Sequence, residues 1–150
     1  RARDGIGRGI AHVWSYGSSV AEVIDIREKD GVIEITGVWI AADLGTILDP
    51  SIVEAQLTGA AIYGLSAATQ GEITFANGAV EQGNFPDYDA LRIYNTPKFH
   101  VMLLENNHRM GGAGEPGTHP DAPALGNAIF DLTGKRLREM PFSKHIDFVA

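Results

Sequence analysis

The stretch HRMGGAGEPGTHPDAP holds the residues whose types and spacing suggest chemistry. Gly112, Gly114 and Gly117 match the pattern G-x-G-x-x-G, which in dinucleotide-binding proteins lets backbone N–H groups approach a phosphate at a helix N-terminus. Glu115 lies in the middle of this loop and brings a negative charge to the place where a phosphate would bind. Pro116 removes one backbone donor as well. We therefore reject a phosphate site here.

Two interpretations of Glu115 remain open from the residues alone. Gly, Pro and Thr cluster in loops, and a Glu within a surface turn is normally solvated. However, the loop lies between the apolar stretch FHVMLLEN and an apolar helix beginning near Asp121, so we expect its middle to be buried. A carboxylate held in such surroundings can accept a proton near neutral pH. The loop is thus either a plain turn or a device that presents one general base.

Other catalytic groups are poorly represented. The chain has no cysteine, which excludes disulfides, thiolate nucleophiles and iron–sulfur ligation within these 150 residues. Its histidines show no i, i+4 pairing of the kind found in zinc sites, and they are His12, His100, His108, His119 and His145. We predict no protein-ligated metal site. His108 and His119 flank the loop and could line its pocket.

Size and charge narrow the class of protein. A chain of 150 residues with 44% hydrophobic content is long enough to bury a core of its own. Twelve basic residues against nineteen acidic ones give a net charge of −7, which disfavours nucleic acid or an anionic membrane as a partner. No apolar run reaches the ~20 residues that span a bilayer. Because the chain begins with Arg1 and not Met, we expect residues 1–150 to be a single domain or a fragment of a larger chain.

The elements that must position the loop begin with a hairpin and a helix. SSVAEVIDIREKDGVIEITGVWIAADLG predicts two strands joined by a tight turn at Asp30-Gly31. LDPSIVEAQLTGAAIYGLSAATQ then changes to helical spacing, with Asp49 as a plausible N-cap and Pro50 at the first helical position. Gly59 and its neighbours on one helix face allow either close helix packing or the approach of a flat ligand.

The second half of the chain completes the predicted fold. Asn77-Gly78 indicates a short hairpin, and FHVMLLEN predicts a buried strand. Asp121 is expected to cap a second helix, which Gly134 ends. We therefore predict an α+β fold: a mixed sheet with hairpins and two packed helices.

The order of several segments resembles a known enzyme family. GGAGEPGTHPDAPALGNAIFDLTGKRLREMP is similar to the C-terminal end of the molybdopterin-binding large subunit of the xanthine oxidase family. AADLGTILDPSIVEAQLTGAAIYGLSAATQGEIT, VEQGNFPDYDALRIYNTP and GRGIAHVWSYGSSVAEV resemble upstream segments in the isoquinoline 1-oxidoreductase beta subunit and aldehyde dehydrogenase-like branch. The resemblance covers nearly all of the chain.

This resemblance implies roles for individual residues. Glu115 occupies the place of the family's general base, which takes a proton from a water-derived oxygen that attacks an electron-poor carbon of an aldehyde or N-heterocycle. Gly111, Gly112, Ala113 and Gly114 match the segment that lies against the molybdopterin cofactor. The cytosine dinucleotide form of that cofactor is the one expected.

The same resemblance implies what lies outside this chain. The expected partners are the remainder of the large subunit, a small subunit carrying iron–sulfur clusters, and a small aldehyde or N-heterocycle as substrate. His119 departs from the family pattern, which has a proline-like position there. The alternative function is a non-catalytic assembly or scaffold module with the same fold. The sequence leaves open a cytoplasmic or periplasmic location.

Overall fold

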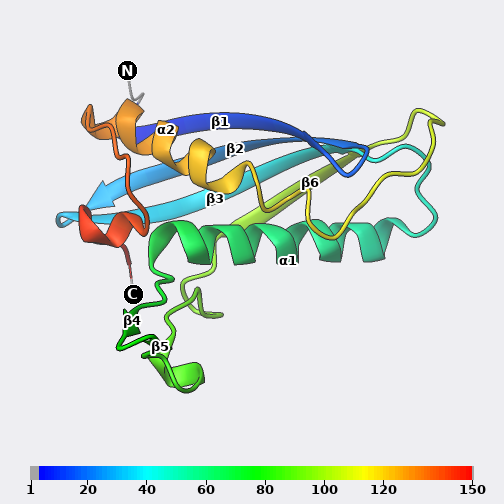
Figure 1. Cartoon of the computed structure of the whole chain (residues 1–150). Coiled ribbons are helices and arrows are strands. Elements are labelled where there is room, and N and C mark those ends of the chain that lie inside the picture. Colours follow the sequence, from blue (N-terminus) through cyan, green and yellow to red (C-terminus); the bar gives the residue numbers. More distant parts are fainter. Residues whose placement is uncertain (1–3, 150) are drawn as a thin grey trace.

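The computed structural model describes residues 4–149 and contains a four-stranded sheet, two α-helices and a projecting arm (Figure 1). The main elements are β1 (Ile6–Ser15), β2 (Ser18–Lys29), β3 (Val32–Asp43), α1 (Pro50–Thr69), β6 (Lys98–Leu104) and α2 (Asp121–Thr133). The strand order is β1-β2-β3-β6, with β3 and β6 parallel and the other neighbours antiparallel. The predicted α+β mixed sheet with two helices is confirmed.

The hairpin between β2 and β3 turns where the sequence predicts. Asp30 and Gly31 both adopt left-handed backbone angles, with φ of 55° and 83°. Two consecutive positive φ values twist the turn in the sense that matches the flanking strands. The pairing of β2 with β3 then runs from Lys29↔Val32 to Ser19↔Asp43, with one irregularity between Asp25 and Ile26.

The strand β1 was not predicted from the sequence. Its inward positions are occupied by Gly7 and Gly9, which hide the alternation of apolar residues that normally marks a strand. A side chain at Gly9 would collide with the backbone of α2 at the Ala124 carbonyl oxygen. The two glycines therefore let α2 lie directly on β1, and the same residues conceal the strand from a search for periodicity.

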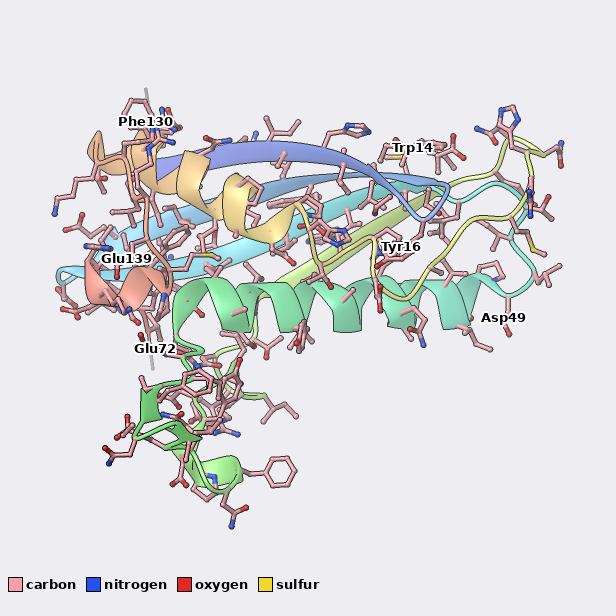
Figure 2. The ribbon with its side chains drawn as sticks, viewed as in Figure 1. Trp14, Tyr16, Asp49, Glu72, Phe130 and Glu139 are labelled. Carbon is pink, nitrogen blue, oxygen red and sulfur yellow. The ribbon has the colours of Figure 1, made fainter. Side chains whose placement is uncertain are left out.

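The two helices begin in different ways. The Asp49 side chain accepts hydrogen bonds from the backbone N–H groups of Ser51 and Ile52 at 3.0 and 3.1 Å, which confirms it as the N-cap of α1 (Figure 2). The predicted capping role of Asp121 in α2 is wrong. Pro120 stands at the N-cap, and Asp121 is the first helical residue with its side chain turned inward.

Both helices cover the same face of the sheet, and the core lies between this face and the two helices (Figure 1). Fully buried apolar side chains come from β2, β3, α1 and α2, and they include Val20, Ile24, Val38, Ile40, Leu57, Leu65, Leu125 and Ile129. Gly134 ends α2 with a φ of 74°, as predicted. No helix within residues 4–149 is long and apolar enough to cross a membrane.

The opposite face of the sheet, away from α1 and α2, carries exposed apolar side chains. Trp14 on β1 is 70% exposed and points away from α1 (Figure 2), and Met102 on β6 is 60% exposed. The prediction of a buried strand at FHVMLLEN is therefore wrong in one respect. A strand forms there, but β6 lies at the sheet edge with one face toward α1, so alternate side chains face solvent.

An arm projects from the end of α1 (Figure 1). It contains the short hairpin of β4 (Phe75–Ala76) and β5 (Ala79–Val80), turned through Asn77-Gly78 as predicted, and the 3₁₀ turn η1 (Phe85–Asp87). A second 3₁₀ turn, η2 (Phe142–Lys144), lies at the base of the arm.

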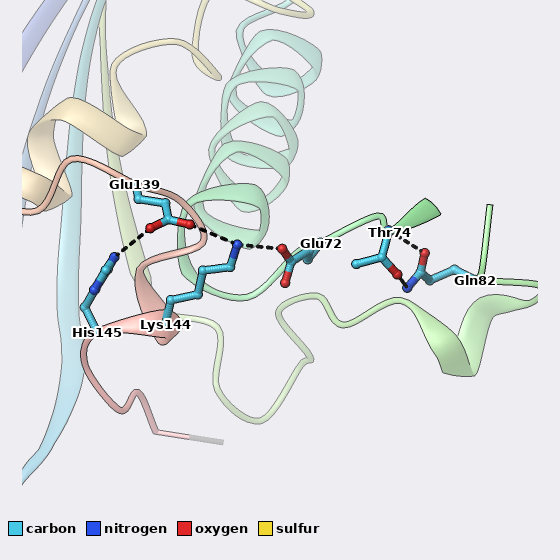
Figure 3. Close-up of polar contacts among 6 residues, drawn as sticks. All are labelled: Glu72, Thr74, Gln82, Glu139, Lys144 and His145. Carbon is cyan, nitrogen blue, oxygen red and sulfur yellow. Dashed lines mark hydrogen bonds and ion pairs between the residues drawn. The ribbon is translucent and has the colours of Figure 1, made fainter. Parts of the chain in front are cut away.

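One ionic cluster joins the arm to the C-terminal segment. The Lys144 ammonium contacts carboxylate oxygens of Glu72 at 2.6 Å and Glu139 at 3.3 Å (Figure 3). Within the arm, the Gln82 amide bonds to the backbone N–H and the hydroxyl of Thr74, both at 2.9 Å.

Candidate cofactor and base site

The loop between β6 and α2 is fixed by backbone contacts to distant parts of the chain. Gly111 donates its N–H to the carbonyl of Leu44 and Gly112 donates to the carbonyl of Tyr16, both at 2.9 Å. The Ser18 hydroxyl donates in turn to the Gly112 carbonyl at 2.7 Å. Since these N–H groups point into the protein, they are not available to a phosphate, in agreement with the rejection of a nucleotide site.

The glycines at 111 and 112 are required by close packing. A Cβ atom at Gly111 would meet the Ser18 hydroxyl and lie 2.6 Å from the Gly17 carbonyl oxygen. One at Gly112 would lie 2.9 Å from the Cβ atom of Tyr16. Real Cβ atoms do not approach other atoms so closely, so any side chain here would push the loop away from the β1–β2 turn.

The second half of the loop rests on α1. The Thr118 hydroxyl donates to the Ala60 carbonyl at 3.2 Å, and the Thr118 N–H closes a turn on the Glu115 carbonyl at 2.9 Å. Pro116 and Gly117 are both buried, and Gly117 packs against Leu57 and Ala60 of α1. The expectation that the middle of the loop is buried thus holds for these two residues.

Glu115 itself is exposed, which corrects the expectation of apolar surroundings. The turn directs Pro116 and Gly117 inward and leaves the Glu115 carboxylate at the rim of an open cleft of about 420 Å³. The cleft lies between the loop and one face of α1, and its lining includes Gln56, Gly59, Tyr63, Glu115, Thr118 and His119.

The sequence left open whether the small residues of α1 serve close helix packing or leave room for a ligand, and two glycines distinguish these alternatives. Gly59 lines the cleft, and nothing lies within 4 Å of the position its Cβ would take. Gly64 lies one turn further on and is packed instead: a Cβ there would meet the Asp121 carboxylate and approach the Thr118 carbonyl oxygen to 2.6 Å. Close packing therefore explains Gly64, while Gly59 leaves open space beside the loop.

Tyr16 is a member of this site that the sequence analysis missed. It lies in the β1–β2 turn beside the loop and above α1 (Figure 2). The pKa of the Tyr16 phenol is raised, first by hydrogen bonding to the nearby Glu115 carboxylate and then by its negative charge. Its ring stacks on that of His119, with centroids 6.1 Å apart and planes inclined by 16°. Its pairing with Glu115 leaves no mark in local sequence.

The other candidate histidine is not brought to Glu115. His108 lines a separate depression with Trp14, Tyr16 and Arg109. Within residues 4–149, no group of three or more His, Asp or Glu side chains is arranged to hold a metal ion.

A pair of buried carboxyl groups lies beneath the loop. Glu22 on β2 and Asp121 at the start of α2 are both fully inaccessible to solvent. Among the described residues, no other group donates a hydrogen bond to any of their four oxygens. The two side chains interact with each other, so one shared proton can supply a hydrogen bond between them.

Burial governs the protonation of this pair. Loss of hydration raises the pKa of Glu22 to about 7, an effect that the hydrogen bond with Asp121 partly opposes. Burial, followed by the charge and hydrogen bond of Glu22, raises the pKa of Asp121 well above its usual range. The burial of Glu22 could have been suspected from the sequence. Side chains alternate between the two faces of β2, and Glu22 takes the inward-facing position between Val20 and Ile24.

Comparisons with known proteins agree with the geometry of the fold. The sequence model of the molybdopterin cofactor-binding domain matches residues 3–97. The beta subunit of isoquinoline 1-oxidoreductase from Brevundimonas diminuta is 34% identical over 142 residues, covering 93% of this chain and 18% of the relative. The membrane-bound aldehyde dehydrogenase (pyrroloquinoline-quinone) of Gluconacetobacter polyoxogenes is 38% identical over 118 residues, covering 79% and 15%.

A solved structure supports the same fold. Quinoline 2-oxidoreductase from Pseudomonas putida 86 superposes with a TM-score of 0.71 over 83% of this chain and 17% of the other, at 19% identity. The chain belongs to the molybdopterin cofactor-binding domain family, as found in large subunits of the xanthine oxidase family. It spans less than a fifth of the length of the curated relatives named here.

Proposed function

We propose that this chain is the base-bearing part of a molybdenum hydroxylase, with Glu115 as the general base. The observation that carries the proposal is the position of the Glu115 carboxylate, exposed at the rim of a cleft on a loop that is fixed by backbone hydrogen bonds. A general base needs both access to the reacting group and a defined position.

The residues of the cleft fit a bulky, flat cofactor. Of the segment Gly111–Gly114, Gly114 lines the cleft and the other three residues are half-buried beside it, while Gly59 also lines the cleft and faces open space. These features support contact between the segment Gly111–Gly114 and molybdopterin. We propose that the pterin itself would carry the molybdenum. We propose the cytosine dinucleotide form of the cofactor.

Molybdopterin, when bound, supplies a metal centre that activates a water-derived oxygen and takes up electrons from the substrate. The chain contributes the proton acceptor. Glu115 would take the proton at a carboxylate oxygen, while Pro116 and Gly117 hold the turn against α1. The cleft wall at Gln56 and Tyr63 supplies polar groups that can orient a small molecule beside the base.

The substrate we propose is an aldehyde or an N-heterocycle. The names of these two relatives refer to isoquinoline and to aldehyde. One of those names also refers to pyrroloquinoline quinone, but the match to the molybdopterin-binding domain model over residues 3–97 favours molybdopterin here. The chain has no cysteine, so iron–sulfur clusters would lie on a partner subunit, with the remainder of the large subunit as a second partner.

The test is Glu115→Gln in the complete enzyme, with molybdenum content measured beside turnover. We expect molybdenum content to stay the same and kcat/KM to fall by roughly 10²–10⁴, because the amide cannot accept the proton. Glu105→Gln is the matched control, since Glu105 is an exposed glutamate of the same connection that does not line the cleft. Full turnover in Glu115→Gln would refute the proposal and favour the non-catalytic scaffold module.

A further inference from the structure

We propose that the outer face of the sheet, the face turned away from α1 and α2, is the surface on which the remainder of the large subunit packs. This inference rests on the proposed function in one respect, that the chain works as part of a longer large subunit. The two relatives named above are much longer than this chain, which spans 18% of one and 15% of the other. Such proteins therefore contain polypeptide that can cover this face.

The outer face gathers apolar side chains from all four strands. Paired positions on neighbouring strands direct their side chains to the same side of a sheet. The large apolar side chains of the outer face are Ile10, Trp14, Val23, Trp39, Met102 and Leu104. They include both tryptophans of the chain. Ala21 and Ala41 pair with each other at the centre, so small side chains lie between the larger ones on β1 and β6.

The apolar side chains at both edges of the outer face are widely exposed. Ile10 is 62% exposed, and Trp14 on the same strand and Met102 on β6 are exposed to a similar extent. Trp14 extends from the sheet on the side away from α1 (Figure 2). A single exposed apolar residue is ordinary, but a continuous apolar patch marks a contact with another surface.

The buried carboxylate of the outer face is neutralised by its neighbour. Asp25 accepts two hydrogen bonds of 2.6 Å from the Arg8 guanidinium. The same guanidinium lies 5.9 Å from the centre of the Trp39 ring, which stacks on His100 with centroids 5.2 Å apart. A Cβ atom at Gly37 would lie 2.7 Å from the Trp39 ring, so the glycine lets this ring lie along the sheet. A partner can thus cover Asp25 and Trp39 without burying an unpaired charge.

The size of the outer face favours a partner in the same polypeptide. From Arg8 to Trp14 and across four strands it measures roughly 20 by 15 Å, or roughly 300–500 Å² with its edge side chains. Covering it would bury roughly 600–1,000 Å² on the two surfaces together, which is typical of contacts between domains of one chain. Stable complexes of separate chains bury more, about 1,200–2,000 Å². We therefore choose the rest of the large subunit over a second copy of this chain or a separate small subunit.

The outer face leads to the loop that carries Glu115. Trp14 and Asp43 lie at one end of the face, and both also line the depression of about 650 Å³ described above for His108. Met110, the residue before Gly111, lines the same depression. A polypeptide packed on the outer face would therefore extend to the segment that enters the loop, on the side of the sheet away from α1.

The first experiment uses methionines of the complete enzyme as reporters. Met102 lies on the outer face and Met140 in the segment after α2, and they are 60% and 51% exposed in this fold. Dilute peroxide oxidises methionines, and mass spectrometry gives the rate at each one. We expect Met102 to react at least about tenfold more slowly in the native enzyme than in the urea-unfolded enzyme, because the partner covers it. Met140 is the internal reference, and a Met102 slowed no more than Met140 would overturn the inference.

The second experiment identifies the partner by cross-linking in the complete enzyme. A photoreactive benzoylphenylalanine in place of His12, beside Ala21 on the outer face, should cross-link to the part of the large subunit outside residues 1–150. The same group in place of Glu28, which is exposed near the β2–β3 turn and lies outside the outer face, is the matched control and should give few such cross-links. Cross-links from position 12 to the iron–sulfur subunit or to a second copy would overturn the choice of partner, and so would the absence of any cross-link.

The outcomes separate this inference from the proposed function. A protected Met102 in an enzyme whose Glu115→Gln variant keeps full turnover would leave the contact standing and remove Glu115 as the base. Loss of turnover in Glu115→Gln together with a readily oxidised Met102 would leave the base standing and overturn the contact.

Discussion

Two carboxylate sites lie on either side of the same stretch of chain and differ in their access to water. Glu115 is exposed on the loop, at the rim of the cleft. Six residues later Asp121 is fully buried at the start of α2, paired with Glu22 on β2. The same functional group therefore meets solvent at one site and the protein interior at the other.

The difference separates two uses of a carboxyl group. Burial raises the pKa of both members of the Glu22–Asp121 pair, so the pair retains a proton and joins α2 to the sheet. No substrate can reach it. Glu115 has the opposite combination, with a rigid backbone and an open approach. In this chain the strongly raised pKa values belong to a buried structural pair. The candidate for catalysis is recognised instead by the access of solvent to its carboxylate.

The largest expected effect contrasts the two sites in turnover. Glu115→Gln should lower kcat/KM by roughly 10²–10⁴ while leaving the free energy of unfolding of the chain nearly unchanged. For the double variant Glu22→Gln, Asp121→Asn we expect turnover near that of the wild type at pH 7 and a change in how the free energy of unfolding depends on pH. Enzyme kinetics and urea unfolding on both variants test this. Equal losses of turnover at the two sites would remove the distinction between them.

The next effect concerns the dependence of stability on pH. Folding raises the pKa of both buried carboxyls, so the folded chain binds protons more tightly than the unfolded chain. The contribution of Glu22 is full below about pH 4.5, its ordinary pKa, and is lost as the pH rises through about 7. The contribution of Asp121 is full below its ordinary pKa of 3.8 and is lost as the pH rises through its strongly raised pKa. We expect the free energy of unfolding to fall by roughly 1–3 kcal/mol between pH 6 and 9.

The control for that titration is the double variant Glu22→Gln, Asp121→Asn. Two amides can still bond to each other, but neither titrates in this range. Its unfolding free energy, measured with urea at each pH, should lack the wild-type decrease. A parallel decrease in the variant would show that other groups cause it.

A smaller effect compares the two glycines of α1. Gly64→Ala places a methyl group against the Asp121 carboxylate and should lower the free energy of unfolding by roughly 1–3 kcal/mol. Gly59→Ala meets open space and should raise it by about 1 kcal/mol through helix propensity. Denaturant unfolding of both variants measures the difference. Destabilisation by Gly59→Ala would contradict the open cleft beside α1.

The smallest effect is expected at the ionic cluster of the arm. Lys144 bridges Glu72 and Glu139 at the surface (Figure 3), and contacts of this kind contribute little to stability because water screens them. Lys144→Met should leave the Tm of the chain almost unchanged. A drop of several degrees in a thermal melt would show that this exposed cluster matters as much as the buried pair.

Local signals in the sequence predicted much of the fold. The turn at Asp30-Gly31, the cap at Asp49 and the C-terminal Gly134 each depend on neighbouring residues, and all three were found where expected. β1 was missed because Gly7 and Gly9 replace its apolar positions, and that replacement depends on α2 lying above them. The exposure of alternate β6 residues likewise depends on its place at the sheet edge.

The candidate site was predictable only in part. Glu115 and the segment Gly111–Gly114 were identified through a family resemblance, and their roles remain predictions. The proximity of Tyr16 to Glu115 could not be predicted, because the two residues lie 99 positions apart in the sequence. Asp121 was misassigned as a cap, since a carboxylate near a helix start has that role more often than a buried one.

The bond between the Ser18 hydroxyl and the Gly112 carbonyl joins residues 94 positions apart. During synthesis the β1–β2 turn leaves the ribosome long before its partner loop, and closing so long a loop is slow. The base site therefore cannot form before the segment around Gly112 has been synthesised and has closed onto the β1–β2 turn. If the proposed function is correct, the cofactor meets a completed base site only after this closure.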